Sequence, residues 1–132
     1  MTVFLDTSAL YAILDADDQN HQPAKQTWVD LIDQEADLAS SNYVLLETFA
    51  LVQSRLGLEA VRTWQEDVVP ILRIEWVTEA HHRTAVMALL TAASRSLSLV
   101  DCVGFEIMRR QGIKIAFAFD RHFARQGFET IP

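Results

Sequence analysis

Short apolar runs alternate with helical segments along the whole chain, and this alternation constrains the fold more than any other feature. The runs with β-forming character are 2–5, 37–40, 72–78, 114–119 and an edge-like run at 128–131. The segments with helical spacing are 8–16, 23–35, 41–56, 58–69, 79–93 and 96–112. Such alternation predicts right-handed βαβ units. We therefore expect an α/β fold, a single-domain α/β/α sandwich with a mostly parallel central sheet.

The length and composition fit one domain spanning 1–132. Half of the 132 residues are hydrophobic, which is enough for a packed core. Cys102 is the only cysteine, which excludes an intrachain disulfide and a cysteine-based zinc site and favours a cytoplasmic location. No apolar stretch is long enough to span a bilayer, and the first residues lack the basic region of a signal peptide. We expect no membrane contact.

The charge is unevenly distributed along the chain. The formal net charge is −7, which argues against binding nucleic acid through a broad basic surface. Residues 1–50 carry nine acids and one base, whereas residues 101–132 carry five bases and four acids. Among those bases, Arg121 directly follows an acid at a strand end, so it is a candidate contact for a phosphate.

Two acids directly follow predicted buried strands. Asp6 comes after the run 2–5, and Asp120 comes after the run 114–119. In parallel sheets, ligands bind at the carboxyl ends of the strands, so both carboxylates are placed where a site would form. The alternative is that each aspartate only caps the helix or turn that follows it.

Two further acids lie within apolar helical segments. Glu47 has Val44, Ala50 and Leu51 as helical neighbours and no Lys or Arg within four residues. If the Glu47 carboxylate is buried, it needs a positively charged or hydrogen-bonding partner. The alternative is that the side chain points to solvent at the margin of the apolar stripe. Asp101 lies three residues after Ser98, a spacing typical of a capping box, which would hold the carboxylate rigidly without excluding a functional role.

Four acids are thus candidates to converge at one end of the sheet. Clustered carboxylates repel one another unless a cation neutralises them. Oxygen ligands without cysteine select Mg²⁺ or Mn²⁺ over zinc. Such ions, alone or as a pair, are a common device for phosphodiester hydrolysis.

The chain resembles the PIN-domain family, and within it the VapC-type toxins of type II toxin–antitoxin systems. The matching segments are FLDTSAL, LLETFALV, LSLVDCVGFEIMRRQGI and AFAFDRHF, in family order and spread over essentially the whole chain. The resemblance implies a metal-dependent endoribonuclease that hydrolyses RNA phosphodiester bonds with Mg²⁺ or Mn²⁺. It also implies a homodimer and a cognate antitoxin. The segment 58–97 matches in pattern only and carries no motif.

The resemblance assigns roles to particular residues. The acidic residues of the family fall on Asp6, Glu47, Asp101 and Asp120, as catalytic residues and metal ligands. Thr7 and Ser8 match the small hydroxyl residues after the first acid, which can orient a water or a phosphate. Together with Arg121 they are the expected substrate contacts.

Two other classes of function are open alternatives. A receiver-type phosphoacceptor domain is also a small acidic α/β fold, but it needs paired acids after the first strand and a Lys at the end of a late strand. Here Thr7 and Ser8 follow Asp6, and the late strand ends in Asp120. A non-catalytic PIN-like binding module is the second alternative, and the four intact acids argue against it.

Overall fold

A five-stranded parallel sheet forms the centre of the molecule, in the computed structural model that describes residues 1–132. The strand order is β3-β2-β1-β4-β5, and all four pairings are parallel. The strands are β1 (Thr2–Leu5), β2 (Asp37–Ser41), β3 (Arg73–Glu75), β4 (Ile115–Phe117) and β5 (Glu129–Ile131). β1 lies in the middle, as expected for a run whose residues Val3, Phe4 and Leu5 are all fully buried.

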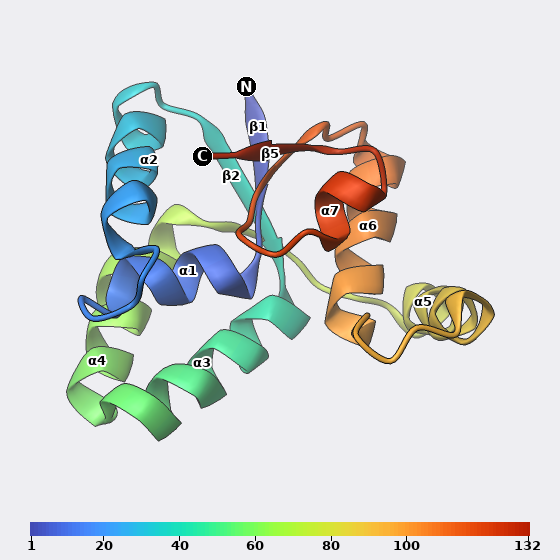
Figure 1. The fold of residues 1–132 in the computed structure, drawn as a ribbon, viewed down its shortest axis with the longest axis horizontal. Helices are drawn as coiled ribbons and strands as arrows, with labels where there is room; N and C mark the ends of the chain where they lie inside the picture. The colour runs from blue at the N-terminus through green and yellow to red at the C-terminus, as the bar shows by residue number, and fades with distance from the viewer.

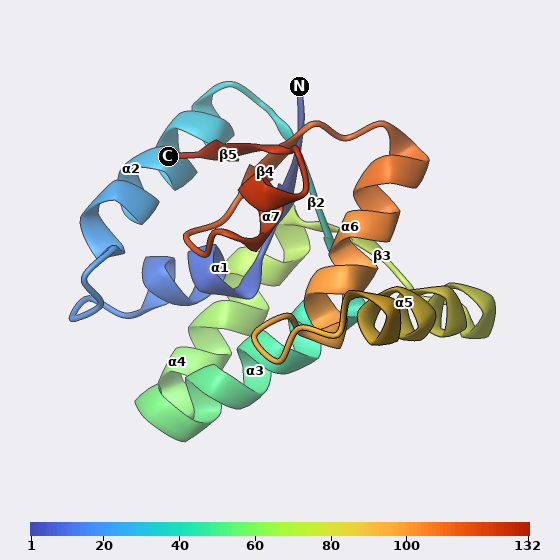
Figure 2. The same ribbon diagram turned by 45° about the vertical axis from the view of Figure 1, so that its right-hand side comes forward.

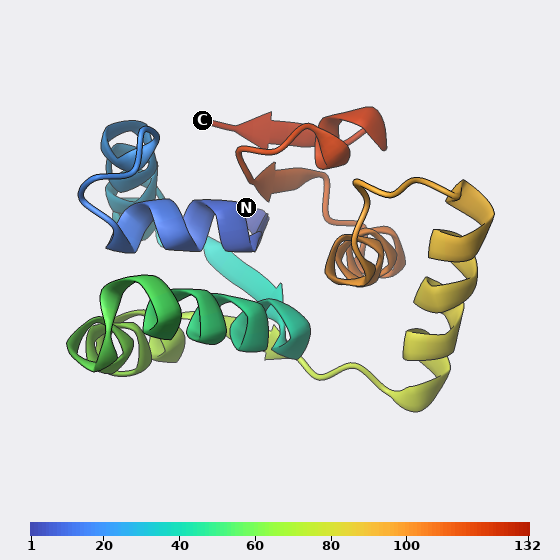
Figure 3. The ribbon, with the colours of Figure 1, turned by 60° about the horizontal axis from the view of Figure 1, so that its bottom comes forward.

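Helices cover both faces of this sheet. α1 to α4 lie on one side and α5 to α7 on the other, which Figures 1 and 3 show as two separate groups. The helices are α1 (Thr7–Leu14), α2 (His21–Asp33), α3 (Asn42–Leu56), α4 (Leu58–Thr63), α5 (Glu79–Ala92), α6 (Leu99–Gln111) and α7 (His122–Arg125). The expected α/β/α sandwich is confirmed. None of these helices combines the length and the apolar character that a bilayer crossing requires.

The structure corrects the sequence prediction in the region 58–78. The expected helix over 58–69 is α4 only as far as Thr63, followed by a π-helical turn, η1 (Trp64–Val68), and a 3₁₀ turn, η2 (Val69–Ile71). Pro70 has no backbone N–H, so a regular helix cannot continue through it. The wider turn keeps Trp64 in the core, where it is 1% exposed. The strand expected over 72–78 is only Arg73–Glu75.

One close approach fixes how α6 lies on the sheet. Gly104 in α6 faces Phe4 of β1, and a Cβ placed on this glycine would lie 3.0 Å from the Phe4 ring. The absence of a side chain therefore lets α6 pack directly on the central strand. Because Asp101 lies in the first turn of the same helix, this contact also helps to set the position of that carboxylate relative to the end of β1.

α5 is attached to the molecule less extensively than the other long helices. Ala85 is the only residue of α5 that is buried. Figure 2 shows the helix extending beyond α6, away from the sheet. Two adjacent histidines link it to its neighbours, His81 to Glu106 of α6 and His82 to Tyr43 of α3. Leu89 also packs against the core, whereas Met87 and Leu90 are exposed.

Candidate metal centre

Asp6 lies at the carboxyl end of β1, where the chain turns into α1. It is the N-cap of that helix, and its Oδ2 accepts hydrogen bonds from the Ser8 backbone N–H at 3.2 Å and from the Ser8 hydroxyl at 2.6 Å. The Asp6 side chain is buried, with 4% of the residue exposed. Asp6 therefore caps a helix, as the alternative held, and also lies at the functional edge of the sheet.

Asp101 approaches the same edge from α6. Its Oδ2 accepts from the Ser98 backbone N–H at 3.2 Å, while its own N–H donates to the Ser98 hydroxyl at 3.0 Å, so the predicted capping box is present. The residue is 8% exposed. The capping box thus anchors a carboxylate at the first turn of α6, where the positive end of the helix dipole stabilises negative charge.

Asp120 comes from the turn between β4 and α7. β4 ends at Phe117, so Asp120 lies three residues beyond the strand and not directly after it as the pattern suggested. Its Oδ1 accepts from the His122 backbone N–H at 2.9 Å. As in Asp6 and Asp101, the hydrogen bonds from backbone N–H groups and from Ser8 engage only one of the two carboxylate oxygens.

These three carboxylates form one cluster. One oxygen from each of Asp6, Asp101 and Asp120 lies within 4.8 Å of the others, a spacing that a single cation could bridge. None of the salt bridges in the structure involves any of the three. The fold therefore gathers negative charge at a buried position without supplying a positive side chain to balance it.

The electrostatic consequence is a shift toward the protonated form. Burial, together with the charges of Asp120 and Asp101, raises the pKa of Asp6 to about 8, although the hydrogen bond from Ser8 acts to lower it. Burial also raises the pKa of Asp101, with a further contribution from Asp120 that the Ser98 hydrogen bonds oppose. A cation would relieve both effects, so this donor set of hard oxygens fits a divalent ion such as Mg²⁺ or Mn²⁺.

Glu47 is the one predicted acid that the structure does not place in the cluster. It lies on α3 with an exposed side chain, which is the solvent-facing alternative and not a buried position. The buried stripe of α3 runs through Val44, Thr48 and Val52, one position away from Glu47, so Glu47 lies at the margin of the stripe. The next residue, Thr48, donates to Thr7 at 3.4 Å, so α3 passes beside the start of α1.

The three expected substrate contacts differ in their surroundings. Thr7 is buried, and its hydroxyl accepts from Thr48. The Ser8 hydroxyl donates to Asp6 and also accepts from the Phe119 N–H at 3.0 Å, a contact that no spacing in the sequence predicts. Arg121 is exposed on the turn after Asp120 and makes no ion pair, so its guanidinium is free for a ligand.

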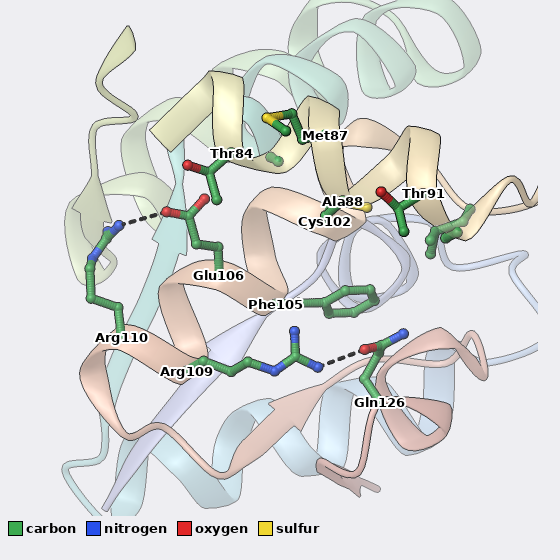
Figure 4. A pocket seen from close by; sticks show the side chains of 13 residues that line it. Thr84, Met87, Ala88, Thr91, Cys102, Phe105, Glu106, Arg109, Arg110 and Gln126 are labelled. Carbon is green, nitrogen blue, oxygen red and sulfur yellow. Dashed lines mark hydrogen bonds and ion pairs between the residues drawn. The ribbon is translucent and has the colours of Figure 1, made fainter. Parts of the chain in front are cut away.

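Two other bases of the last third have partners within the protein. Arg109 donates to Gln126 at 2.6 Å and lies over the Phe105 and Phe128 rings, and Arg110 pairs with Glu106 at 3.3 Å. Figure 4 shows both arginines at the margin of a groove between α5 and α6. Arg109 and Arg110 therefore make contacts that stabilise the chain itself.

Comparison with known proteins identifies the family. The PIN domain family model matches residues 3–129, nearly the whole chain. The chain belongs to the PIN-domain family. The resemblance found in the four sequence segments is therefore confirmed.

Relatives and solved structures agree with this assignment. The chain is 35% identical over 130 residues to the 23S rRNA-specific endonuclease VapC20 of two Mycobacterium tuberculosis strains, covering 98% of this chain and 97% of the relative. It is similar to the crystal structure of M. tuberculosis VapC20, described as a sarcin–ricin loop cleaving toxin. The TM-score is 0.85 at 33% identity, with 98% of this chain and 99% of that chain covered. Within the PIN-domain family, this chain thus resembles the VapC-type toxins.

Two more distant structures share the fold. FitAcB from Neisseria gonorrhoeae aligns with a TM-score of 0.70 at 15% identity, covering 100% of this chain and 97% of that chain. VapBC2 from Rickettsia felis, bound to a DNA fragment from its promoter, also has a TM-score of 0.70, at 13% identity with 98% and 97% covered. At these identities the likeness concerns the arrangement of helices and strands.

Proposed function

We propose that this protein is a metal-dependent endoribonuclease of the VapC type, the toxin of a toxin–antitoxin pair. The observation that carries the proposal is the cluster of Asp6, Asp101 and Asp120, in which Asp6 and Asp101 are buried and Asp120 is partly buried, and no Lys or Arg pairs with any of the three. The near full-length similarity to a 23S rRNA-specific endonuclease supports RNA as the substrate. The sarcin–ricin loop of 23S rRNA, named for the similar crystal structure, is the first RNA to test.

The three aspartates would hold Mg²⁺ or Mn²⁺ through the oxygens that the caps leave available. When bound, such an ion lowers the pKa of water and neutralises charge on the phosphodiester. The chain itself supplies rigid carboxylates, since backbone N–H groups fix Asp6, Asp101 and Asp120 before any ligand arrives. Arg121, exposed beside Asp120, is suited to hold an RNA phosphate next to the site.

The direct test is cleavage of a sarcin–ricin loop RNA by the purified chain. We expect cleavage with Mg²⁺ or Mn²⁺, none with a chelator, and a loss of activity in Asp101→Asn with the fold retained. Sequencing the RNA ends would locate the cut. If the wild-type chain cleaves neither this RNA nor total RNA with either ion, the enzymatic proposal is wrong, and a non-catalytic PIN-like module becomes the better description.

Glu47 is proposed as a fourth acid that acts from the edge of the site. Its carboxylate is solvated, so it would contribute less to metal binding than the buried acids do. We expect Glu47→Gln to lower cleavage by roughly tenfold, the low end for groups near a metal. Cleavage by Glu47→Gln equal to wild type would remove Glu47 from the site.

A protein partner is proposed from the distribution of charge. Nine of the 18 acids lie in residues 1–50, which have one base, Lys25. The acids among them that lie outside the proposed site, in residues 15–18 and 30–37, suit a basic segment of an antitoxin. Co-expression with the product of the adjacent gene, followed by copurification and inhibition of cleavage, would test this partner.

We also propose a homodimer in which a second copy covers the outward face of α5. Met87 and Leu90 on this helix are 70% and 72% exposed, beside a groove of about 820 Å³ between α5 and α6 (Figure 4). Pairing two α5 helices across a two-fold axis would bury both side chains in each copy. We expect Leu90→Glu to convert a dimer to a monomer in light scattering, whereas Leu46→Glu, equally exposed on α3, should not. A wild-type monomer would contradict the dimer.

A further inference from the structure

The sheet changes its hydrogen-bonding pattern where β1 turns into α1. The Asp6 N–H donates to the Phe117 carbonyl at 3.1 Å, which continues the parallel β1–β4 ladder by one residue. In a parallel ladder, the next bond would run from the Phe119 N–H to the Asp6 carbonyl. That carbonyl instead accepts from Ala9 and Leu10, in the first turn of α1. The start of the helix thus takes away the acceptor that Phe119 would use.

The Ser8 side chain replaces that acceptor. Its hydroxyl oxygen accepts the Phe119 N–H at 3.0 Å and donates its proton to the Asp6 carboxylate at 2.6 Å. A hydroxyl has a single proton, so this proton is already engaged by the carboxylate. One side chain therefore joins two segments that are 111 positions apart in sequence. One of these segments carries Asp6, and the other carries Asp120 directly after Phe119.

We propose that Ser8 is a positioning residue that sets the distance between the Asp6 and Asp120 carboxylates, and not a contact for the RNA phosphate. This inference rests on the proposed metal-dependent nuclease function. The two acids come from different strands, and past the end of the β1–β4 ladder the Ser8 hydroxyl connects their segments. Without it, the turn 118–121 would keep its covalent path but lose the bond that holds it against α1.

The test compares Ser8→Ala with Ser8→Thr in the full chain. Ser8→Ala removes both hydrogen bonds, whereas Ser8→Thr keeps a hydroxyl. We expect Ser8→Ala to weaken Mn²⁺ binding, measured calorimetrically without RNA, by about 10–100-fold, as for other groups that orient metal ligands. The kcat should fall with little change in KM for RNA. The Phe119 amide should lose protection in hydrogen exchange, and Ser8→Thr should restore all three quantities.

A matched control separates positioning from a general loss of a buried hydroxyl. Ser40 in β2 is also buried and donates to the Leu5 carbonyl at 2.8 Å, directly before Asp6. We expect Ser40→Ala to lower the denaturation midpoint without changing Mn²⁺ affinity or kcat. An equal loss of Mn²⁺ affinity in Ser40→Ala would overturn the specific role of Ser8.

Three other outcomes would each contradict the positioning role of Ser8, for different reasons. If Ser8→Ala binds Mn²⁺ and cleaves as well as wild type, Ser8 does not position the acids. If instead KM rises while kcat and Mn²⁺ affinity are unchanged, Ser8 contacts substrate and the inference is wrong. If the wild-type chain itself fails to bind Mn²⁺ and to cleave RNA, the proposed function fails, and the inference fails with it, whatever the variants do.

Discussion

The two ends of the sheet both gather acids, but they balance the charge in different ways. At the amino end of β2, Arg73 binds both oxygens of Asp37, at 3.1 and 2.9 Å, and it also contacts Glu75 of its own strand at 2.6 Å. At the other end, Asp6, Asp101 and Asp120 meet without an ion pair to any basic side chain. The Arg73 hydrogen bond lowers the pKa of Asp37, whereas burial and neighbouring acids raise that of Asp6 to about 8. An acid cluster that is completed within the chain stabilises structure, and one left incomplete is suited to an external cation.

The largest expected difference between the two ends is in catalysis. We expect Asp6→Asn to reduce RNA cleavage at least about a hundredfold, because it removes a proposed ligand of the ion that the reaction needs. Asp37→Asn removes an acid at the opposite end and should leave the rate of cleavage unchanged. Rates measured at saturating Mg²⁺ check both variants. Equal losses would mean that the effect comes from folding and not from the site.

The next effect concerns stability without divalent ions. The Asp6 pKa is raised in the folded state, so its contribution to stability is complete below about pH 4 and is lost as pH rises toward about 8. The free energy of unfolding should therefore fall across this window by an amount on the order of a few kcal/mol. Asp6→Asn should lack this decline and be more stable than wild type at pH 8, as urea unfolding in a chelator would show.

The Asp37 carboxylate, which is paired with Arg73, should contribute the opposite pH dependence of the unfolding free energy. The Asp37 pKa is lowered in the folded state, so its contribution to stability is present above its unfolded pKa and is lost as pH falls through the folded value.

One outcome would contradict the raised pKa of Asp6. It is a gain in the stability of wild type in chelator between pH 5 and 8, with identical behaviour of Asp6→Asn.

The smallest effect on stability is expected from removing Arg73. The Arg73 and Asp37 side chains are 42% and 44% exposed, so solvent screens their attraction. We expect Arg73→Met to cost about 0.5 kcal/mol in unfolding free energy at neutral pH, without altering cleavage. A loss of cleavage in Arg73→Met would show that the two ends of the sheet are coupled, against the separation described above.

The sequence alone predicted much of this site because strand ends are local features. Asp6 follows a buried run, and the spacing of Ser98 and Asp101 specifies a capping box, so their convergence could be expected. Contacts between distant segments could not be read from spacing. The bond from Phe119 to Ser8 arises only when α1 removes a ladder acceptor. Glu47 was expected near the buried stripe, and its exposure depends on how α3 is rotated against α1.

The most direct test of the central claim is the number of protons released when Mn²⁺ binds at pH 7. The claim is that the three aspartates hold a proton only because they lack a cation. Since the pKa of Asp6 is about 8, a bound ion should displace close to one proton per chain at pH 7. Calorimetric titration in buffers of different ionisation enthalpy measures this number. We predict a release near one at pH 7 that falls to about half at pH 8, is nearly gone at pH 9 and is absent in Asp6→Asn. Binding without proton release, or no binding at all, would contradict the account.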